Sequence, residues 1–253
     1  MQDERLVGEF THQAESFNRS QAANARETLE ALVELADPRP GERWLEAACG
    51  PGVVARALAP RAGAVHGVDL TPAMVELARR EAAGLGNATF SVGDATALDE
   101  PDEAFDGALT RFTVHHVPVP ARLVEELVRV VRPAGAVVLA DHLLDEDPAA
   151  AAWSQELERL RDPSHWASLP LERLRALGAD AGLRLETEAI VPLVLDLGEW
   201  LERGSGTAVA RPLLERLLAA PPASARRFVV QGGTLTMTWW AARFRRPEGP
   251  SPG

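Results

Sequence analysis

Short apolar runs and amphipathic segments alternate along the first half of the chain. The runs read as strands, and the segments between them carry apolar residues at helical spacing. The predicted strands are Arg43–Ala48, Ala64–Leu70, Thr89–Val92, Asp106–Phe112 and Ala136–Asp141, and the predicted helices are Val53–Ala59, Pro72–Ala83 and Ala121–Val131. Strands that alternate with helices indicate right-handed crossovers and a parallel sheet, so we expect an α/β fold.

The pattern differs on both sides of this alternation. Residues 1–36 place Phe10, Ala14 and Phe17 at helical spacing, and the breaker cluster Asp37–Gly41 ends that segment. Beyond Asp141 the sequence predicts helices at Ala149–Arg161, Leu171–Ala181, Leu197–Arg203 and Ala208–Ala219, and strands at Leu183–Leu195 and Val229–Ala242. We expect an N-terminal helical lid (1–36), an α/β domain (37–144 and 170–245), cap insertions (145–169 and 197–220) and a flexible tail (246–253).

The composition excludes several classes of protein. Of the 253 residues, 46% are hydrophobic, which is typical of a globular protein. No apolar run approaches the roughly 20 residues that cross a bilayer, and the polar N-terminus is no secretory signal. A net charge of −11 without any lysine disfavours nucleic acid as a partner. The single cysteine, Cys49, excludes an internal disulfide. We expect a cytoplasmic monomer or homodimer.

Candidate chemistry is concentrated where the predicted strands end. The first strand carries Glu46 and passes through the turn Gly50-Pro51-Gly52 into a helix, and the second strand carries Asp69 near its end. In an α/β sheet such a turn places a nucleotide-like cofactor at the start of the helix. An acid at the tip of the second strand suits hydrogen bonds to both hydroxyls of a ribose. The sequence therefore predicts a cofactor that contains a ribose.

Three acidic side chains narrow the choice of cofactor. Residues 50–55 also satisfy the dinucleotide pattern G-x-G-x-x-G/A, but that pattern alone is weak. A carboxylate at Glu46, four residues before Gly50, repels a pyrophosphate and attracts an ammonium or sulfonium. Asp94, after the third strand, suits the exocyclic amine of adenine. Glu46, Asp69 and Asp94 together favour a ligand that is cationic at one end and carries adenosine at the other.

These motifs resemble those of the class I S-adenosylmethionine-dependent methyltransferases. The resemblance extends from Phe10 to Ala242 and is carried by Leu45–Gly52, Gly67–Met74, Gly93–Ala95, Phe105-Asp106, His115-His116 and Leu127–Gly135. Within the class, the chain is similar to the small-molecule branch typified by ubiquinone and menaquinone biosynthesis methyltransferases. The resemblance implies S-adenosyl-L-methionine as cofactor. It also implies a Rossmann-like seven-stranded sheet, mostly parallel, with an antiparallel last strand.

The resemblance further implies which residues meet the cofactor. The methionine part is assigned to Glu46, Ala48, Cys49, Gly50 and Gly52, the ribose to Asp69, and the adenine to Leu70, Met74, Asp94 and Ala95. Two positions depart from the family pattern, because Ala48 replaces a glycine and Glu46 replaces a common aspartate. Arg111, at the end of the fourth strand, is a further cofactor-binding candidate. It also suits an acidic acceptor or an ion pair with an aspartate, and we favour the ion pair.

Histidines supply the candidates for acid–base catalysis. His115 and His116 follow the fourth strand, whose carboxyl end faces the ligand crevice, and either one suits a general base while the other is structural. His165 is a further candidate, and Ser164 before it is expected to cap a helix. The histidines lack the spacing of metal ligands, so we expect no metal site.

The sequence therefore predicts methyl transfer to oxygen or carbon of a small organic acceptor, with S-adenosyl-L-homocysteine as the second product. Indole side chains in the cap segments, such as Trp153 and Trp200, favour an apolar or aromatic acceptor of quinone or specialised-metabolite biosynthesis. Three alternatives remain open. They are a cyclisation or decarboxylation on the same cofactor fold, an NAD-dependent oxidoreductase, and a non-enzymatic regulatory protein.

Overall fold

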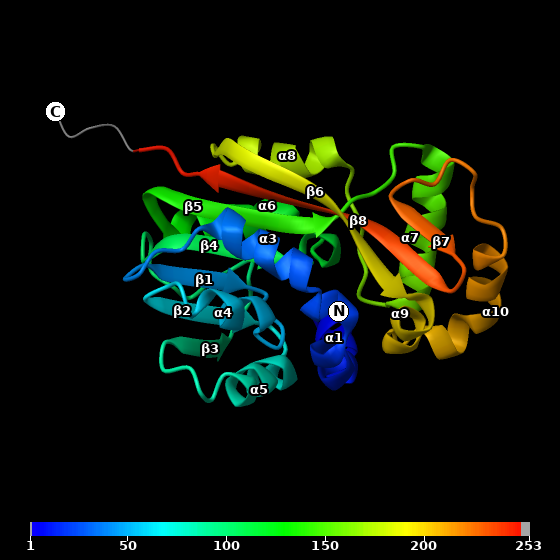
Figure 1. Cartoon of the computed structure of the whole chain (residues 1–253), viewed down its shortest axis with the longest axis horizontal. Helices are drawn as coiled ribbons and strands as arrows, with labels where there is room; N and C mark the ends of the chain where they lie inside the picture. Colours follow the sequence, from blue (N-terminus) through cyan, green and yellow to red (C-terminus); the bar gives the residue numbers. More distant parts are fainter. Residues whose placement is uncertain (1, 249–253) are drawn as a thin grey trace.

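The computed structural model describes residues 2–248 and is built around one eight-stranded sheet (Figure 1). The strands are β1 (Arg43–Ala47), β2 (Ala64–Asp69), β3 (Ala88–Val92), β4 (Phe105–Arg111), β5 (Val131–His142), β6 (Arg184–Asp196), β7 (Phe228–Gln231) and β8 (Thr234–Arg245). Their order is β3-β2-β1-β4-β5-β8-β6, with β7 paired to β8 outside this path. Strands β1 to β5 run parallel, whereas β8 is antiparallel to β5 and β6. The expected Rossmann-like sheet with an antiparallel last strand is confirmed.

The prediction of one continuous strand over Val229–Ala242 is wrong. The structure divides this segment into β7 and β8, which form an antiparallel hairpin closed between Gln231 and Thr234. The two turn residues, Gly232 and Gly233, have φ angles of 58° and 83°, a combination that glycine adopts at little cost. The sheet therefore contains one strand more than the seven expected.

Helices cover both faces of the sheet. One face carries α3 (Arg26–Ala36), α4 (Val53–Leu58) and α5 (Pro72–Glu81), and the other carries α6 (Pro120–Val130) and α8 (Leu171–Asp180) (Figure 1). Trp239 belongs to the apolar core of the first face and Trp240 to that of the second. Neighbouring residues of β8 serve opposite cores because side chains alternate along a strand.

A cap lobe extends from the long strands β6 and β8, beyond the parallel part of the sheet (Figure 1). It consists of the ends of these strands, β7, α7 (Pro148–Arg161), α9 (Leu197–Arg203) and α10 (Thr207–Leu218). Trp153, Trp200, Phe228 and Leu235 form its apolar core. The lobe thus has a core of its own beside the cofactor-type domain.

The N-terminal segment 1–36, predicted as a lid, forms three helices with different neighbours. Helix α1 (Gln2–Arg19) packs on α5, where Ala14 contacts Met74 and Leu77. Helix α2 (Gln21–Asn24) is one turn long, and α3 lies on the sheet as part of its core. Of these three helices, only α1 and α2 therefore lie beside the carboxyl ends of the parallel strands.

The structure covers only part of the predicted C-terminal tail. Of the predicted tail 246–253, residues 249–253 lie outside the described part, and the carbonyl of Arg246 accepts a hydrogen bond from the backbone of Ala134 at 3.0 Å. Within residues 2–248, no helix combines the length and apolar character that a membrane span requires.

Candidate active site

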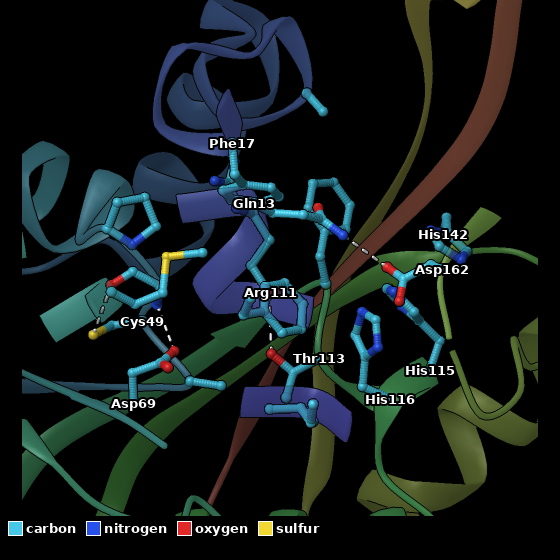
Figure 2. Close-up of a pocket in the computed structure, with 18 of the residues that line it drawn as sticks. Gln13, Phe17, Cys49, Asp69, Arg111, Thr113, His115, His116, His142 and Asp162 are labelled. Atoms are coloured by element: carbon cyan, nitrogen blue, oxygen red, sulfur yellow. Dashed lines mark hydrogen bonds between the residues drawn. The ribbon is translucent and has the colours of Figure 1, made fainter. Parts of the chain in front are cut away.

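One cavity lies at the carboxyl ends of the parallel strands, between the sheet, α1 and the cap lobe (Figure 2). All the cofactor-binding and catalytic candidates line it, except Gly52 and His165, whereas Trp153, expected near the acceptor, belongs to the core of the cap lobe instead. Those that line it are Glu46, Ala48, Cys49, Gly50, Asp69, Leu70, Met74, Asp94, Ala95, Arg111, His115 and His116. The strand ends therefore bring both the cofactor candidates and two catalytic candidates to one place.

Asp69, the last residue of β2, is fixed by the loops on both sides of it. Its carboxylate oxygens accept hydrogen bonds from the backbone nitrogens of Gly50 and Thr71, each at 2.8 Å. Burial raises the pKa of Asp69, and the two backbone hydrogen bonds oppose that rise. Because a carboxylate oxygen has two lone pairs, each oxygen can also accept from a hydroxyl group. The site fits a ribose diol.

Glu46 on β1 is only 3% exposed, so its carboxyl group is almost completely shielded from water. Its Oε2 accepts a hydrogen bond from the backbone nitrogen of Ala55 on α4 at 2.7 Å. Burial raises the pKa of Glu46 to about 8, although the guanidinium of Arg111 opposes this. A cationic group on a ligand, such as an ammonium, would stabilise the ionised form of this buried carboxyl.

The loop between β1 and α4 has three residues in the left-handed region. Ala48, Gly50 and Gly52 have φ angles of 54°, 51° and 71°. A Cβ atom at Gly52 would lie 2.7 Å from the ring of Phe90, so this glycine allows the loop to pack on β3. Cys49 is buried, and burial raises the pKa of its thiol well above the ordinary value. The thiol is therefore neutral and acts as a small packing group.

The residues assigned to adenine lie together at the β2 and β3 ends of the cavity. Leu70 lines it from the loop after β2 and Met74 from the first turn of α5. Asp94 and Ala95 line it from the loop after β3. The Oδ1 of Asp94 accepts hydrogen bonds from the backbone nitrogen and the hydroxyl of Thr96, both at 2.8 Å. An apolar surface beside a fixed carboxylate suits a planar base with an exocyclic amine.

Arg111, the last residue of β4, does not form the predicted ion pair with an aspartate. Its Nη2 donates to the carbonyl of Ala23 at 3.1 Å, and in residues 2–248 it has no acidic partner within 4 Å. Its buried Nη1 has no hydrogen-bond partner among the described residues. Burial lowers the pKa of Arg111 to about 10, so the side chain stays charged at neutral pH. The ion-pair interpretation failed because β4 delivers this guanidinium to the cavity, away from aspartates.

His115 lies at the centre of a stack of imidazole rings after β4. Its Nδ1 is 2.6 Å from Oδ1 of Asp141, and its ring centroid lies 4.1 Å from those of both His116 and His142. Burial lowers the pKa of His115 well below the ordinary value, so the ring is neutral. Asp141 accepts a hydrogen bond from the Nδ1–H group of His115, which leaves the lone pair of the neutral ring on Nε2.

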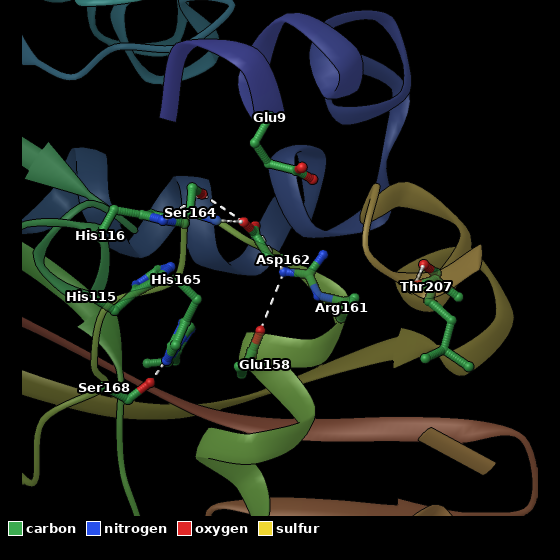
Figure 3. Close-up of polar contacts among 12 residues, drawn as sticks. Glu9, His115, His116, Glu158, Arg161, Asp162, Ser164, His165, Ser168 and Thr207 are labelled. Carbon is green, nitrogen blue, oxygen red and sulfur yellow. Dashed lines mark hydrogen bonds and ion pairs between the residues drawn. The ribbon is translucent and has the colours of Figure 1, made fainter. Parts of the chain in front are cut away.

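His116 is the end of a second chain of hydrogen bonds (Figure 3). The hydroxyl of Ser164 donates to Oδ1 of Asp162 at 2.5 Å and lies 3.0 Å from Nδ1 of His116. Because the only proton of Ser164 is used on Asp162, its oxygen accepts from a protonated Nδ1. The relay therefore holds His116 in the tautomer whose Nε2 accepts protons.

His165 lies next to the histidine stack but does not line the cavity. Its Nε2 is 2.7 Å from Oε1 of Gln155, and burial lowers its pKa to about 4. The predicted helix start at Ser164 is wrong, because residues 163–164 form a turn and residues 165–167 have no regular secondary structure. The backbone nitrogen and hydroxyl of Ser164 are both bound to Asp162, which closes the turn instead. The position of His165 indicates a structural role.

His115, Asp141 and His142 also form a group with the composition of a metal site. One potential ligand atom from each lies within 4.8 Å of the others. Sequence spacing did not suggest this group because its members come from two separate strand ends. The Nδ1 of His115 is bonded to Asp141, and the Nε2 of His142 lies 2.9 Å from the hydroxyl of Ser168. We interpret the group as hydrogen-bonded, because Asp141 already binds His115 and Ser168 already binds His142.

Several cavity residues were not among the sequence candidates. His142 ends β5, and its place at a strand end was a usable signal. Arg161 and Arg203 gave no such signal, because a charged residue in the last turn of a helix is usually solvated. Other residues line the cavity from α1, from the cap lobe and from β8: Phe10, Gln13, Phe17, Leu193, Leu195, Met237 and Trp239. Trp200, which the sequence placed near the acceptor, lines it as well.

Comparison with known proteins agrees with this geometry. Residues 45–139 match the family model of a methyltransferase domain. The protein YcgJ of Bacillus subtilis, named an uncharacterized methyltransferase, is 31% identical over 201 residues, which cover 79% of each chain. A demethylmenaquinone methyltransferase of Clavibacter sepedonicus is 36% identical over 111 residues, covering 44% of this chain and 45% of that protein.

Solved structures share the fold. The crystal structure of the Bacillus subtilis YcgJ protein has a TM-score of 0.80 at 27% identity, and the match covers 88% of this chain and 99% of the other. A geranyl diphosphate methyltransferase in complex with S-adenosylmethionine has a TM-score of 0.61 at 18% identity, with 87% and 84% covered. The sheet, the cofactor-type cavity and these relatives lead to one conclusion: the chain belongs to the class I methyltransferases that use S-adenosyl-L-methionine.

Proposed function

We propose that this enzyme methylates an oxygen or carbon atom of a small, largely apolar organic acceptor. The observation that carries the proposal is the continuity of one cavity, which runs from Asp69 at the cofactor end to His115 and His116 (Figure 2). A cofactor site beside two histidines in a proton-accepting tautomer suits an acceptor that loses a proton as it is methylated.

The residues of the cofactor half fit S-adenosylmethionine in charge and shape. When bound, this cofactor supplies an electrophilic methyl group on a sulfonium sulfur. Asp69 offers acceptors for the ribose hydroxyls, and Glu46 offers a carboxyl for the ammonium group. The unpartnered Nη1 of Arg111 offers a donor for the carboxylate of the methionine part. These three charges orient the cofactor along the strand ends.

Proton transfer is assigned to the two histidines that line the cavity. The Ser164 hydroxyl holds Nδ1 of His116 protonated, so Nε2 of His116 accepts the proton of an acceptor hydroxyl or acidic carbon. Asp141 orients His115 in the same way. The ring of His116 meets Phe10 of α1 edge-on at 5.0 Å, which places an apolar cover over the base. This cover excludes water from the reacting atoms.

The experiment is turnover with purified enzyme, S-adenosylmethionine and a panel of phenols, quinols and apolar carbon acids, with S-adenosylhomocysteine quantified by mass spectrometry. We expect S-adenosylhomocysteine and methylated acceptor in equal amounts. With the acceptor so identified, His116→Asn is expected to lower kcat by about 100-fold or more. The matched variant His165→Asn alters a neighbouring histidine outside the cavity and is expected to retain most of the activity.

Two outcomes would contradict the proposal. An acceptor that is converted without formation of S-adenosylhomocysteine would indicate cyclisation or decarboxylation on this fold. Equal loss of activity in the His116 and His165 variants would show that the stack acts through packing rather than proton transfer.

A further inference from the structure

Two buried arginines, Arg161 and Arg203, face the cavity from the cap lobe. Arg161 ends α7 and Arg203 ends α9, and they are only 6% and 8% exposed. The guanidinium of Arg161 lies over the ring of Trp200 at 4.6 Å, and that of Arg203 lies over the ring of Phe17 at 5.5 Å. Aromatic faces thus hold both cations at the wall of the site.

Among the described residues, the surrounding acids form ion pairs with only one of the two, Arg161. The Nη2 of Arg161 donates to Glu158 at 3.2 Å and to Asp162 at 3.4 Å (Figure 3). The side chain of Arg203 has no hydrogen bond or ion pair with any residue in the described part of the chain. Glu158, Glu199 and Asp162 favour the charged form of Arg203 only through longer-range attraction, and Glu9 is bonded to Ser205. A buried cation without a partner is costly, so Arg203 favours a ligand that supplies one.

Unused hydrogen-bond atoms indicate the chemistry of that ligand. In the described chain, the buried Nε and Nη1 of Arg161 and the buried Nε of Arg203 have no partner. Two acceptors beside these arginines are also without a partner among the described residues: Oε1 of Glu158, and Nδ1 of His165, whose Nε2 donates to Gln155. Because unused donors outnumber unused acceptors, the group that binds here presents mainly acceptor oxygens. Burial lowers the pKa of Arg203 to about 10, so its charge persists at neutral pH.

We propose that the acceptor carries an anionic group, a carboxylate or a phosphate, that binds between Arg161 and Arg203. This inference rests on the proposed function, since it describes the acceptor of that reaction. Asp162 bonds to Arg161 through Oδ2 and to Ser164, the partner of His116, through Oδ1. The anionic group therefore lies close to the proton-accepting histidine. Leu193, Leu195 and Met237 line the same cavity and contact the apolar body of the acceptor.

The test compares matched probes on enzyme saturated with S-adenosylhomocysteine, by isothermal titration calorimetry. The probes are octanoate, octyl phosphate and the uncharged octanamide. At least one anion is expected to bind ten or more times tighter than octanamide, and the better anion identifies carboxylate or phosphate as the native group. In Arg203→Met the preference is expected to fall below threefold, and in Arg203→Lys part of it is expected to remain. Equal binding of anions and amide by the wild-type enzyme would overturn the proposal.

The control variant is Arg43→Met, because Arg43 also lies over a phenylalanine ring, Phe105 at 5.3 Å, but outside the cavity. It is expected to keep the preference for anions. Without ligand, Arg203→Met is expected to melt at the wild-type temperature or above it, because an unpaired buried charge has been removed. A clear fall in melting temperature would assign Arg203 a structural role and refute the inference.

The affinity for S-adenosylhomocysteine separates this inference from the proposed function. Arg203→Met is expected to bind S-adenosylhomocysteine as the wild type does. If the wild-type enzyme forms no S-adenosylhomocysteine with any acceptor but still prefers anions through Arg203, the proposed reaction fails while the anion site stands. If turnover is observed and the acceptors show no preference for an anionic group, the anion site fails alone.

Discussion

The affinity for S-adenosylhomocysteine is expected to rise with pH, because Glu46 must lose a proton to receive the ammonium group. Burial raises the pKa of Glu46 to about 8 from an ordinary value of 4.5. Below pH 8 the unliganded enzyme therefore holds this carboxyl protonated, and binding of a cation releases the proton. A binding step that releases one proton gains about tenfold in affinity per pH unit, so we expect about 100-fold between pH 5.5 and 7.5. Above that range the α-amino group of the ligand begins to lose its own proton, at about pH 8.

Isothermal titration calorimetry at pH 5.5, 6.5 and 7.5 measures this effect. Repeating each titration in two buffers of different ionisation enthalpy gives the number of protons released, which we expect to approach one at pH 6.5. The control is Glu46→Gln, which keeps an oxygen for the backbone nitrogen of Ala55 but cannot titrate. The reasoning is refuted if the wild-type affinity is constant over this range, or if Glu46→Gln shows the same slope.

The same equilibrium makes a prediction for stability. Between pH 4.5 and about 8 the native state binds a proton at Glu46 that the unfolded chain does not bind. The free energy of unfolding of the unliganded enzyme therefore falls as pH rises, by up to about 1.4 kcal/mol per pH unit from this group. Denaturant titrations are expected to show Glu46→Gln more stable than the wild type at pH 8, and the difference is expected to vanish near pH 4.5.

Three further substitutions test the cofactor loop and the core. Asp69→Asn replaces one acceptor oxygen by an amide donor that faces a backbone N–H, and calorimetry is expected to show S-adenosylhomocysteine binding weakened by about tenfold or more. Ala48→Gly relieves a φ of 54°, and denaturant titration is expected to show a gain of about 0.5–1 kcal/mol; destabilisation would contradict the assigned strain. Gly107→Ala would bring a Cβ within 2.5 Å of the Trp44 ring, which is expected to cost about 1–3 kcal/mol of unfolding free energy. In the control Gly84→Ala, no atom lies within 4 Å of the new Cβ and we expect a change below about 0.5 kcal/mol.

The cofactor half could be predicted because its signals are local in sequence. Glu46 and the loop up to Gly52 belong to one strand–turn–helix unit, and Asp69 ends the next strand. In a parallel sheet the carboxyl ends of neighbouring strands meet at one edge, so residues at successive strand ends converge without any further information. The structure brings Glu46, Asp69 and Asp94 to one cavity for this reason.

The catalytic half could be predicted only in part. His115 and His116 were found because they follow β4, but the partners that fix their tautomers, Asp141 and Ser164, come from segments far along the chain. Proximity in sequence suggested a helix cap for Ser164, whereas tertiary contact makes it the link between Asp162 and His116. The double glycine at 232 and 233 was a readable hairpin signal, and a continuous apolar pattern on both sides concealed it.

The acceptor half is built from elements that have no common sequence pattern. Phe17 comes from α1, Arg161 from the end of α7, Arg203 from the end of α9 and Met237 from β8. A terminal arginine on a helix is normally solvated, whereas Arg203 is buried where α9 packs against α1 and lies beside the end of α7. Whether a charged side chain is buried or solvated thus depends on how the lobe packs, and no single segment of the sequence shows it. Because methyltransferases of this fold share the cofactor half, acceptor specificity resides in contacts of this kind, and Arg161 and Arg203 are where substitutions are expected to change it.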